Sequence, residues 1–499
     1  MAASLWLSWQ DRVSLSCSDD QAIVAGPAAR LALRPVAPEI ATAMQRLAPP
    51  GEDEEQLAKS VLAAGNLESL ARWYYHVNQL NRRGLVRRSL RAEGALIATL
   101  VPLGRSCGAV NGRVSANGHK VSHNGKAPAA GTVKSLDASE SSFVLSRFAY
   151  IRREGSELVV ESPQAAARVI LHDPRALAII GTMGQPATTA DVAARIADLP
   201  PAAVRALLGL LDDAGMLDEA GMATSPGAGS NLELESWEFH DLLFHSRSRR
   251  GRSDGRFGAT YRLAHRPPVP ALKPTGDREW HDLEIPDLDR LAREDPSLSE
   301  VQRRRRSIRK YGAQPITDRQ LGEFLYRVGR VTERWRADVP APSDPVSMDF
   351  ASRPYPSGGA LYELELYAAV NNCRNLAAGL YDYDPEHHRL GRVAGATGDV
   401  GLLLDEAAAS AGIGRETVQV LIILAARFQR IAWKYESIAY SLILKNVGVL
   451  FQTMYLAATA MGLAPCALGC GNSDVFARAA GTDYYVESSV GEFLLGSRE

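Results

Sequence analysis

The chain opens with alternating hydrophobic and polar positions, which then give way to helical spacing. Runs such as LWLSW and RVSLSC alternate with a period of two, which predicts short strands near the N-terminus. Apolar residues then recur every three or four positions and predict helices: Ile40, Met44 and Leu47, then Leu67, Leu70, Tyr74 and Val77. A glycine-punctuated hairpin pattern follows. Residues 1–103 are therefore predicted to form a small winged-helix-like domain.

The same order of elements recurs after residue 140. The stretch FVLSRFAYIRREGSELVVESP predicts a hairpin that turns at Glu154-Gly155, and RVILHDP predicts a third strand. Helices are predicted at residues 175–183, 189–196 and 202–214, the last of them ended by Gly215. We therefore expect a second winged-helix-like domain over residues 137–225, which makes the pair a tandem duplication.

Two segments separate these units from each other and from the rest of the chain. Residues 104–136 hold many Gly, Ser, Asn and Ala residues and almost no large apolar ones, which predicts a flexible linker. Residues 226–290 form a charged and partly Pro-rich bridging segment. Over residues 291–499, strand patterns (LYELELYAAV, VQVLIILAARF) occur with long helical ones (AYSLILKNVGVLFQTMYLAATAMG), which predicts an α+β domain.

Composition narrows the class of protein. The chain has 499 residues, a formal charge of -1, 46% hydrophobic and 23% charged residues, which is typical of a globular protein and gives no support for nucleic-acid binding. Five cysteines do not predict a disulfide framework; Cys466 and Cys470 have no ligand-type neighbours and are predicted to be small buried residues, with no metal site. With no signal peptide and no apolar run of about 18 residues, we expect a cytoplasmic protein that does not contact a membrane.

A run of basic residues supplies the first candidate site. In RRRRSIRKYG, Arg305, Ser307 and Arg309 alternate next to a predicted helix. Two guanidiniums and a hydroxyl that converge on one point suit a phosphate, because arginine binds phosphate through paired hydrogen bonds. The competing interpretation is a solvated basic face.

A turn of small residues supplies the second. It consists of Pro356, Ser357, Gly358, Gly359 and Ala360 and stands directly before a predicted strand. Small residues in such a turn let backbone N–H groups approach a planar ring or its phosphate. The competing interpretation is an ordinary entry into a strand.

Together with the hairpin GLYDYDPEHHRL, these motifs make residues 295–499 resemble the nitroreductase-like flavoproteins, and more narrowly the SagB-type or McbC-like azoline dehydrogenases. The resemblance implies bound FMN and the oxidation of thiazolines and oxazolines to thiazoles and oxazoles in a ribosomally made peptide. The N-terminal units resemble those of cyanobactin oxidases, and the second is PqqD-like, as in leader-peptide recognition. The partners implied are an azoline-containing precursor peptide, a cyclodehydratase complex and a second copy of the chain.

The segment RIAWKYESIAY contains the pair that is most diagnostic of this family, Lys434 and Tyr435. The resemblance assigns both to proton transfer at the substrate ring while hydride leaves to the flavin. A phenol beside an ammonium is expected to have a lowered pKa, which would favour tyrosine as a base; which of the two takes the proton stays open. The competing interpretation is an amphipathic helix with an exposed lysine and a buried tyrosine.

The helix predicted over residues 439–461 is apolar nearly all round, so we expect it to be buried in a core or a subunit contact. The resemblance implies that such a helix builds a homodimer interface at which FMN lies. Val449 stands where many relatives carry a histidine, which puts a polar role at that position in doubt. The resemblance also makes Gly469 a candidate for close approach to the flavin ring and Arg498 one for binding its phosphate.

Three other functions compete with azoline oxidation. The first is reduction of small molecules by an NAD(P)H-dependent nitroreductase-like enzyme, and the second is a peptide-binding scaffold whose flavin domain is inactive. The third, DNA binding by the winged-helix-like units, is disfavoured because neither unit has a strongly basic recognition helix.

Overall fold

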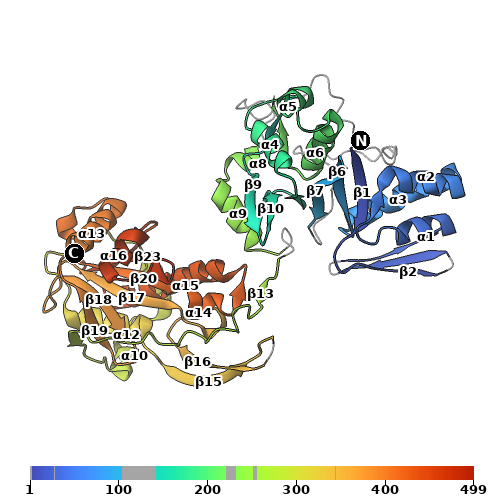
Figure 1. Ribbon diagram of the computed structural model, residues 1–499. Coiled ribbons are helices and arrows are strands. Elements are labelled where there is room, and N and C mark those ends of the chain that lie inside the picture. The colour runs from blue at the N-terminus through green and yellow to red at the C-terminus, as the bar shows by residue number, and fades with distance from the viewer. Residues whose placement is uncertain are drawn as a thin grey trace. The chain divides into compact units, whose positions relative to one another are not determined.

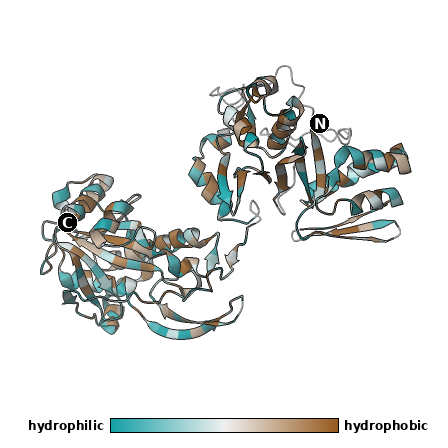
Figure 2. Ribbon diagram, viewed as in Figure 1, coloured by the Kyte–Doolittle hydropathy of each residue, from teal (hydrophilic) through white to brown (hydrophobic). Residues whose placement is uncertain are grey.

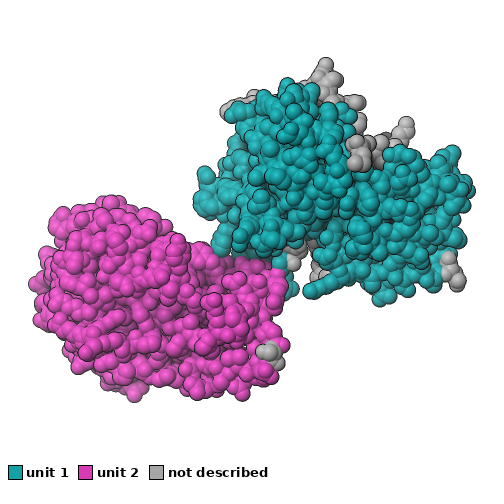
Figure 3. Space-filling view, viewed as in Figure 1, with its two compact units in different colours: residues 1–255 teal, residues 256–499 magenta. Residues whose placement is uncertain are grey.

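The computed structural model describes residues 3–18, 20–26, 29–103, 142–220, 232–250, 255–342 and 344–499. These belong to two compact units, residues 1–255 and residues 256–499 (Figure 3). The linker predicted over residues 104–136 lies outside the described residues. The division between the units falls at Gly255, inside the predicted bridging segment, so residues 256–290 belong to the C-terminal unit.

The first half of unit 1 contains the expected strands, helices and closing hairpin. One helix, α2, was missed; it begins where the side chain of Asp53 accepts hydrogen bonds from the backbone N–H groups of Glu55 and Gln56. The elements are β1 (Ser4–Trp9), β2 (Ser14–Ser18), β3 (Gln21–Ala25), β4 (Arg30–Leu33), α1 (Pro38–Gln45), β5 (Glu52–Asp53), α2 (Glu54–Ala64), α3 (Leu67–Arg82), β6 (Val86–Ala92) and β7 (Ala95–Pro102).

The second half follows its predicted order closely. The hairpin turns at Glu154-Gly155, and α5 begins with a capping box between Thr188 and Asp191. The elements are β8 (Phe143–Leu145), β9 (Tyr150–Glu154), β10 (Glu157–Glu161), β11 (Ala167–Leu171), α4 (Pro174–Thr182), α5 (Thr189–Arg195), α6 (Pro201–Asp213), β12 (Leu217–Glu219), α8 (Leu232–Glu235) and α9 (Phe239–Arg247).

The two halves share one sheet. Strand β7 pairs antiparallel with β11, with Thr99 opposite Ile170, which gives the seven-stranded order β5-β1-β6-β7-β11-β10-β9 (Figure 1). The core under α4, α5 and α6 includes Leu90, Ile97 and Leu100 from the first half. The first half, expected as a separate domain, therefore contributes to the hydrophobic core of the second half and keeps a further core of its own.

Unit 2 is built on an antiparallel seven-stranded sheet of order β14-β19-β18-β17-β20-β23-β22. Its elements are β13 (Gly258–Ala259), β14 (Trp280–Asp282), α10 (Leu288–Glu294), α11 (Leu298–Arg304), α12 (Asp318–Gly329), β15 (Glu333–Val339), β16 (Val346–Ser352), the 3-10 turn η1 (Gly358–Ala360), β17 (Leu364–Val370), β18 (Gly379–Asp384), β19 (Arg389–Ala394), α13 (Gly398–Ala411), η2 (Arg415–Thr417), β20 (Val420–Arg427), α14 (Phe428–Ala432), β21 (Tyr435–Glu436), α15 (Ala439–Ala460), β22 (Ala464–Ala467), α16 (Ser473–Ala480) and β23 (Glu487–Gly496).

The sheet of unit 2 is covered on both faces. Every residue of β17 and β20 is buried, and hydrophobic residues run along this sheet in Figure 2. Alternate residues of these strands pack against α12 and α15 on one face and against α13 and α16 on the other. This arrangement confirms the expected α+β fold with a central antiparallel sheet.

The long helix α15, expected to be buried in a core or a subunit contact, is only partly covered within the single chain. Tyr440, Leu444 and Val449 are 48%, 39% and 36% exposed, so the helix keeps an apolar outer face. Among the described residues, α15 is also the one helix whose length and composition would let it cross a membrane, a test that core helices of soluble proteins pass as well. In unit 2 its inner face packs on the sheet.

The shared sheet of unit 1 predicts long-range destabilisation. Ile97→Ala empties a site that is fully buried beneath the helices of the other half, so we expect a loss of about 2–5 kcal/mol in the free energy of unfolding. Hydrogen exchange of α6 should speed up, as measured by mass spectrometry. Leu62→Ala, at an exposed position on α2, is the control and should change stability by no more than about 0.5 kcal/mol. Unchanged exchange in α6 would contradict a common core.

Candidate active site

Helix α15 lies at the meeting point of the predicted motifs. The end of α11, the turn η1, helix α14 and strand β22 all contact it. Asn446 and Tyr455, which face two of these motifs, are nine residues apart and therefore separated by about 13 Å along the axis. The helix thus holds two groups of candidate residues at two levels.

The first group lies beside Tyr455. Helix α11 ends at Arg304, so the motif that follows is extended rather than helical, and the backbone N–H of Ile308 donates to Pro465 O of β22 at 2.8 Å. The Ser307 hydroxyl is 2.7 Å from the Tyr455 hydroxyl, and the Arg305 guanidinium lies 5.3 Å from the centre of the Tyr455 ring. This brings one guanidinium and one hydroxyl of the predicted phosphate set to one place.

Arg305 and Arg309 carry uncompensated charge. Neither forms an ion pair with any carboxylate in the part of the chain that the structure describes, whereas Arg303 and Arg304 both pair with Glu300. Ser307 and Arg309 also act on the thiol of Cys466 on β22, because both lower a pKa that burial raises overall. Free guanidiniums beside a hydroxyl are a donor set that fits the phosphate of FMN.

The second group surrounds the turn Pro356–Ala360. Asn446 of α15 accepts a hydrogen bond from Gly358 N at 3.2 Å, and it donates to Ser357 Oγ at 3.1 Å and to Glu363 Oε1 at 2.8 Å. Glu363 is fully buried, and this burial raises the pKa of its carboxyl. A buried polar network therefore fixes the turn against the helix.

The backbone of this turn is strained as well as tethered. Gly359, Ala360 and Tyr362 have φ angles of +67°, +56° and +45°. Residues other than glycine rarely adopt this region of backbone conformation. Non-glycine residues remain in such conformations only where the surroundings dictate them, and they concentrate at functional sites.

Lys434 and Tyr435 lie just after the end of α14, and the turn Pro356–Ala360 lies against their side chains. A Cβ atom on Gly359 would lie 2.6 Å from Tyr435 Oη and 3.0 Å from Lys434 Nζ. This close approach and the positive φ angle of residue 359 both favour glycine at this position. The Lys434 ammonium lies 5.4 Å from the centre of the Tyr435 ring and 6.0 Å from that of Tyr261.

The electrostatics of the pair are the reverse of what the sequence suggested. Burial lowers the pKa of Lys434, and no carboxylate within the described residues pairs with it. Burial, and secondarily the neighbouring Tyr261, raises the pKa of Tyr435. The expectation that the ammonium would lower the pKa of this tyrosine is wrong, because desolvation of both groups outweighs their mutual attraction.

The remaining predicted residues lie apart from the pair. Gly469 is exposed on the loop after β22, with open space where a Cβ would stand. Arg498 is exposed, and its carbonyl approaches Gly312, three residues after Arg309. Of the two cysteines, Cys466 is buried as predicted, whereas Cys470 is exposed. No group of side chains that could hold a metal ion occurs among the described residues.

Sequence reasoning missed four residues that build this region: Asn446, Glu363, Tyr261 and Arg430. Asn446 gave a signal, since it interrupts an apolar helix, and Glu363 stands in an otherwise apolar strand pattern. A polar residue within a buried element generally marks a hydrogen-bonded partner. Nothing in the sequence identified Tyr261.

Three family models match consecutive parts of the chain. The ThcOx helix turn helix domain matches residues 1–109, cyanobactin oxidase ThcOx matches residues 143–254, and the nitroreductase family matches residues 303–496. Residues 303–496 are thus similar to the nitroreductase family, and the N-terminal residues are similar to two parts of ThcOx.

The chain is also similar to individual proteins, over about half of its length or less. A Methanocaldococcus jannaschii protein that carries a nitroreductase name, MJ1384, is 28% identical over 188 residues, which is 38% of this chain and 83% of the relative. A nitroreductase-type structure from Anabaena variabilis is 23% identical with a TM-score of 0.35, over 51% of this chain and 45% of its own length. A chain of the E. coli microcin synthetase McbBCD complex with truncated pro-MccB17 bound is 21% identical, with a TM-score of 0.31, over 41% and 74%. The chain thus spans less than half of the Anabaena protein.

The network around Asn446 generates a prediction about stability. Asn446→Ala leaves Glu363 and Ser357 short of a partner in a buried site, so we expect a loss of about 1–3 kcal/mol, measured by chemical unfolding. Losing the amide raises the pKa of Glu363 in the fold further, and a raised carboxyl pKa favours folding at low pH only. The deficit should therefore grow as the pH rises above the ordinary glutamate pKa of about 4.3. Gln302→Ala, at an exposed amide on α11, is the control; an equal loss in both variants would contradict the network.

Proposed function

We propose that this chain is an FMN-dependent dehydrogenase that oxidises thiazoline or oxazoline rings to thiazoles or oxazoles in a ribosomally made peptide. The observation that most supports this proposal is the half-buried ammonium of Lys434, which pairs with no described carboxylate. It lies with Tyr435 beside the strained turn at Gly359. Support also comes from the ThcOx models that match the N-terminal unit of the same chain.

In this proposal the two groups of residues along α15 bind different parts of FMN. Arg305, Ser307 and Arg309 hold the phosphate of FMN, with Arg498 as a further candidate cation at the chain's end. Pro356, Ser357, Gly358, Gly359 and Ala360 would bring backbone close to the ring, and Gly469, which has open space where a Cβ would stand, is a further candidate for contact with it. FMN would supply a hydride acceptor there, with dioxygen as an oxidant that could restore it.

Within the pair, Lys434 is the base. Desolvation lowers its pKa, which makes the neutral amine available at a lower pH, while Tyr435 has a raised pKa and stays a protonated phenol. The amine takes the proton from the ring carbon as the neighbouring hydrogen leaves with its electron pair. The azoline thereby loses two hydrogens and becomes aromatic. The phenol donates a hydrogen bond that orients the ring.

The proposal includes partners. A peptide bearing azolines implies a cyclodehydratase that makes them, and the chain would act with such a complex in the cytoplasm, its N-terminal units available for the leader. A second copy of the chain would cover the apolar outer face of α15, where Tyr440, Leu444 and Val449 are exposed.

A nitroreductase-like activity on small molecules is the second candidate, supported by the nitroreductase family model and by the name of the M. jannaschii relative. The two candidate activities differ in the direction of electron transfer: azoline oxidation takes electrons from the substrate, whereas nitroreduction delivers electrons to it. NAD(P)H oxidation in the presence of a nitroaromatic compound would favour this second candidate.

The deciding experiment uses the purified full-length protein. Its visible spectrum and the mass of the heat-released cofactor identify a bound flavin. Incubation with an azoline-containing peptide in air should then remove two hydrogens per ring, read by mass spectrometry. A protein that refuses added FMN, or an FMN protein that leaves azolines unchanged, would overturn the proposal.

Arg305→Ala and Arg309→Ala should each weaken FMN binding by about 10- to 100-fold, because each removes charge-assisted hydrogen bonds worth about 1.5–3 kcal/mol. Flavin fluorescence titration measures the effect. Arg303→Ala removes an equal charge from the same basic run, but that arginine pairs with Glu300, so it should bind FMN normally. Equal losses in all three variants would point to general electrostatics instead.

Lys434→Ala and Tyr435→Phe should retain FMN and lose turnover, by about 10²- to 10⁴-fold for the base. In the parent enzyme, kcat should rise with pH as Lys434 loses its proton, with a midpoint below the ordinary lysine pKa, and the residual activity of Tyr435→Phe should keep that rise. Lys59→Ala, at an exposed lysine of unit 1, is the control. Full azoline oxidation in both site variants would remove the assignment.

A further inference from the structure

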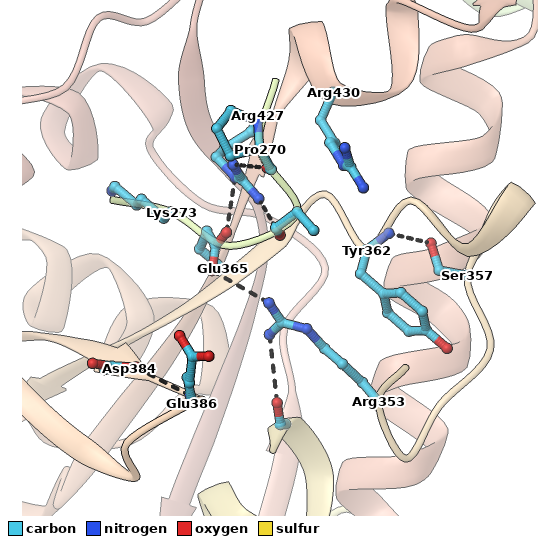
Figure 4. A network of polar contacts seen from close by, with 12 residues as sticks. Pro270, Lys273, Arg353, Ser357, Tyr362, Glu365, Asp384, Glu386, Arg427 and Arg430 are labelled. Carbon is cyan, nitrogen blue, oxygen red and sulfur yellow. Dashed lines mark hydrogen bonds and ion pairs between the residues drawn. The ribbon is translucent and has the colours of Figure 1, made fainter. Parts of the chain in front are cut away.

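Residues 256–273, which we name the strap, run against the catalytic pair although they lie outside the three matched ranges. One end is held by two buried arginines, Arg427 at the end of β20 and Arg430 of α14. Arg427 donates to Pro270 O and Ala271 O, both at 2.9 Å, and Arg430 donates to Val269 O at 2.6 Å. Figure 4 shows Arg427 between Pro270 of the strap and Glu365 of β17. These guanidiniums fix the strap by its backbone, whatever side chains it carries.

The other end pairs directly with the segment that carries Lys434 and Tyr435. Strand β13 of the strap forms a short antiparallel ladder with β21, in which Ala259 stands opposite Tyr435. The backbone N–H of Tyr261 donates to the carbonyl of Lys434 at 3.1 Å, and Thr260 Oγ1 donates to Glu436 at 2.7 Å. The main chain of both catalytic candidates is thus held by residues outside the range that matches the nitroreductase family.

Tyr261 is the strap residue that reaches the pair with its side chain. Its ring lies edge-on to Trp433, with 5.8 Å between centroids, and 6.0 Å from the Lys434 ammonium. Its φ angle of +52° is in the left-handed region, which a tyrosine adopts only when its surroundings dictate it. The ammonium therefore lies within about 6 Å of the centres of two phenol rings, one from the strap and one from Tyr435.

The groups that face Lys434 can be named from every neighbouring element. They are the Tyr261 phenol from the strap, the Tyr435 phenol from β21 and the uncharged turn at Gly359. The nearby carboxylate of Glu436 is engaged by Thr260 and Arg256, and Arg430 of α14 is directed to backbone carbonyls. Aromatic surface, not an opposite charge, is what surrounds this amine in the described structure.

We propose that Tyr261 is a positioning residue for Lys434, which its ring shields from water and its backbone N–H holds in place. That this positioning serves catalysis rests on the proposed function, in which Lys434 is the base. That Tyr261 shields and holds Lys434 does not depend on the proposed function. The strap then belongs to the active site, although sequence-family boundaries leave it out. Because unit 1 ends at residue 255, the strap is also the first segment of unit 2 after the N-terminal domains.

The test measures the titration of Lys434 in the full-length protein without flavin or peptide. Reductive methylation with ¹³C-formaldehyde labels the lysines, which number eight in the sequence, and Lys434→Arg identifies its NMR signal by loss. In Tyr261→Ala, water reaches the amine, so its midpoint should move up toward the ordinary lysine value of about 10.4. Tyr261→Phe keeps the ring and should keep the parent midpoint, and Tyr485→Ala, an 80% exposed tyrosine of the same unit, should also leave it unchanged.

Tyr261→Gly guards against misfolding, because glycine adopts the positive φ without strain and still removes the ring. An unchanged Lys434 midpoint in both ring-removing variants, with only the melting temperature lowered, would overturn the proposal and leave the strap as structural cover. The azoline assay then separates the two hypotheses. If the Lys434 midpoint shifts in the ring-removing variants but the parent protein does not oxidise azolines, the role of Tyr261 is retained and the proposed function is rejected. If the parent protein oxidises azolines but the midpoint does not shift, the proposed function is retained and the role of Tyr261 is rejected.

Discussion

A guanidinium that is fully removed from water must find acceptors, and Arg430 meets this requirement with main-chain carbonyls alone. It donates to Leu361 O at 2.9 Å, Val269 O at 2.6 Å and Asp349 O at 2.7 Å. Burial and the neighbouring Arg427 lower its pKa to about 10, so the charge is costly and each acceptor matters. Because these carbonyls belong to the strap, the β15–β16 hairpin and the segment after the glycine turn, one side chain joins three distant stretches four residues before Lys434.

The candidate site depends on that junction. The turn at Gly359 is held from one side by Arg430 through Leu361 and from the other by Asn446 of α15. Its strained backbone then reaches the Lys434–Tyr435 pair so closely that a methyl group at position 359 would lie 2.6 Å from the Tyr435 hydroxyl and 3.0 Å from the Lys434 ammonium. Buried hydrogen bonds thus stabilise a conformation that local sequence preferences would not select.

Desolvation sets the chemistry of the pair. Two phenol rings and the turn surround the Lys434 amine, and no described carboxylate compensates its charge. Away from water the neutral form of each titratable group is favoured, which lowers the pKa of a lysine and raises that of a tyrosine. The order of proton affinities between Lys434 and Tyr435 is therefore a property of the surrounding aromatic surface, to which Tyr261 contributes.

The sequence by itself determined most elements of unit 1 and, in unit 2, the central strands β17 and β20 and the long helix α15, because period-two and three-to-four patterns with Pro and Gly located them. It did not locate α2, α10, α12, α13, α16 or the β15–β16 hairpin. It also supplied the arginine, glycine-turn and Lys-Tyr motifs, because these are short and contiguous. Only the tertiary structure decided that β7 pairs with β11, that α15 keeps an apolar outer face, and that Tyr261 and Asn446 join the pair and the turn. Strand pairing, desolvation and the direction of a pKa shift depend on residues far apart in the chain, and local patterns carry no information about such neighbours.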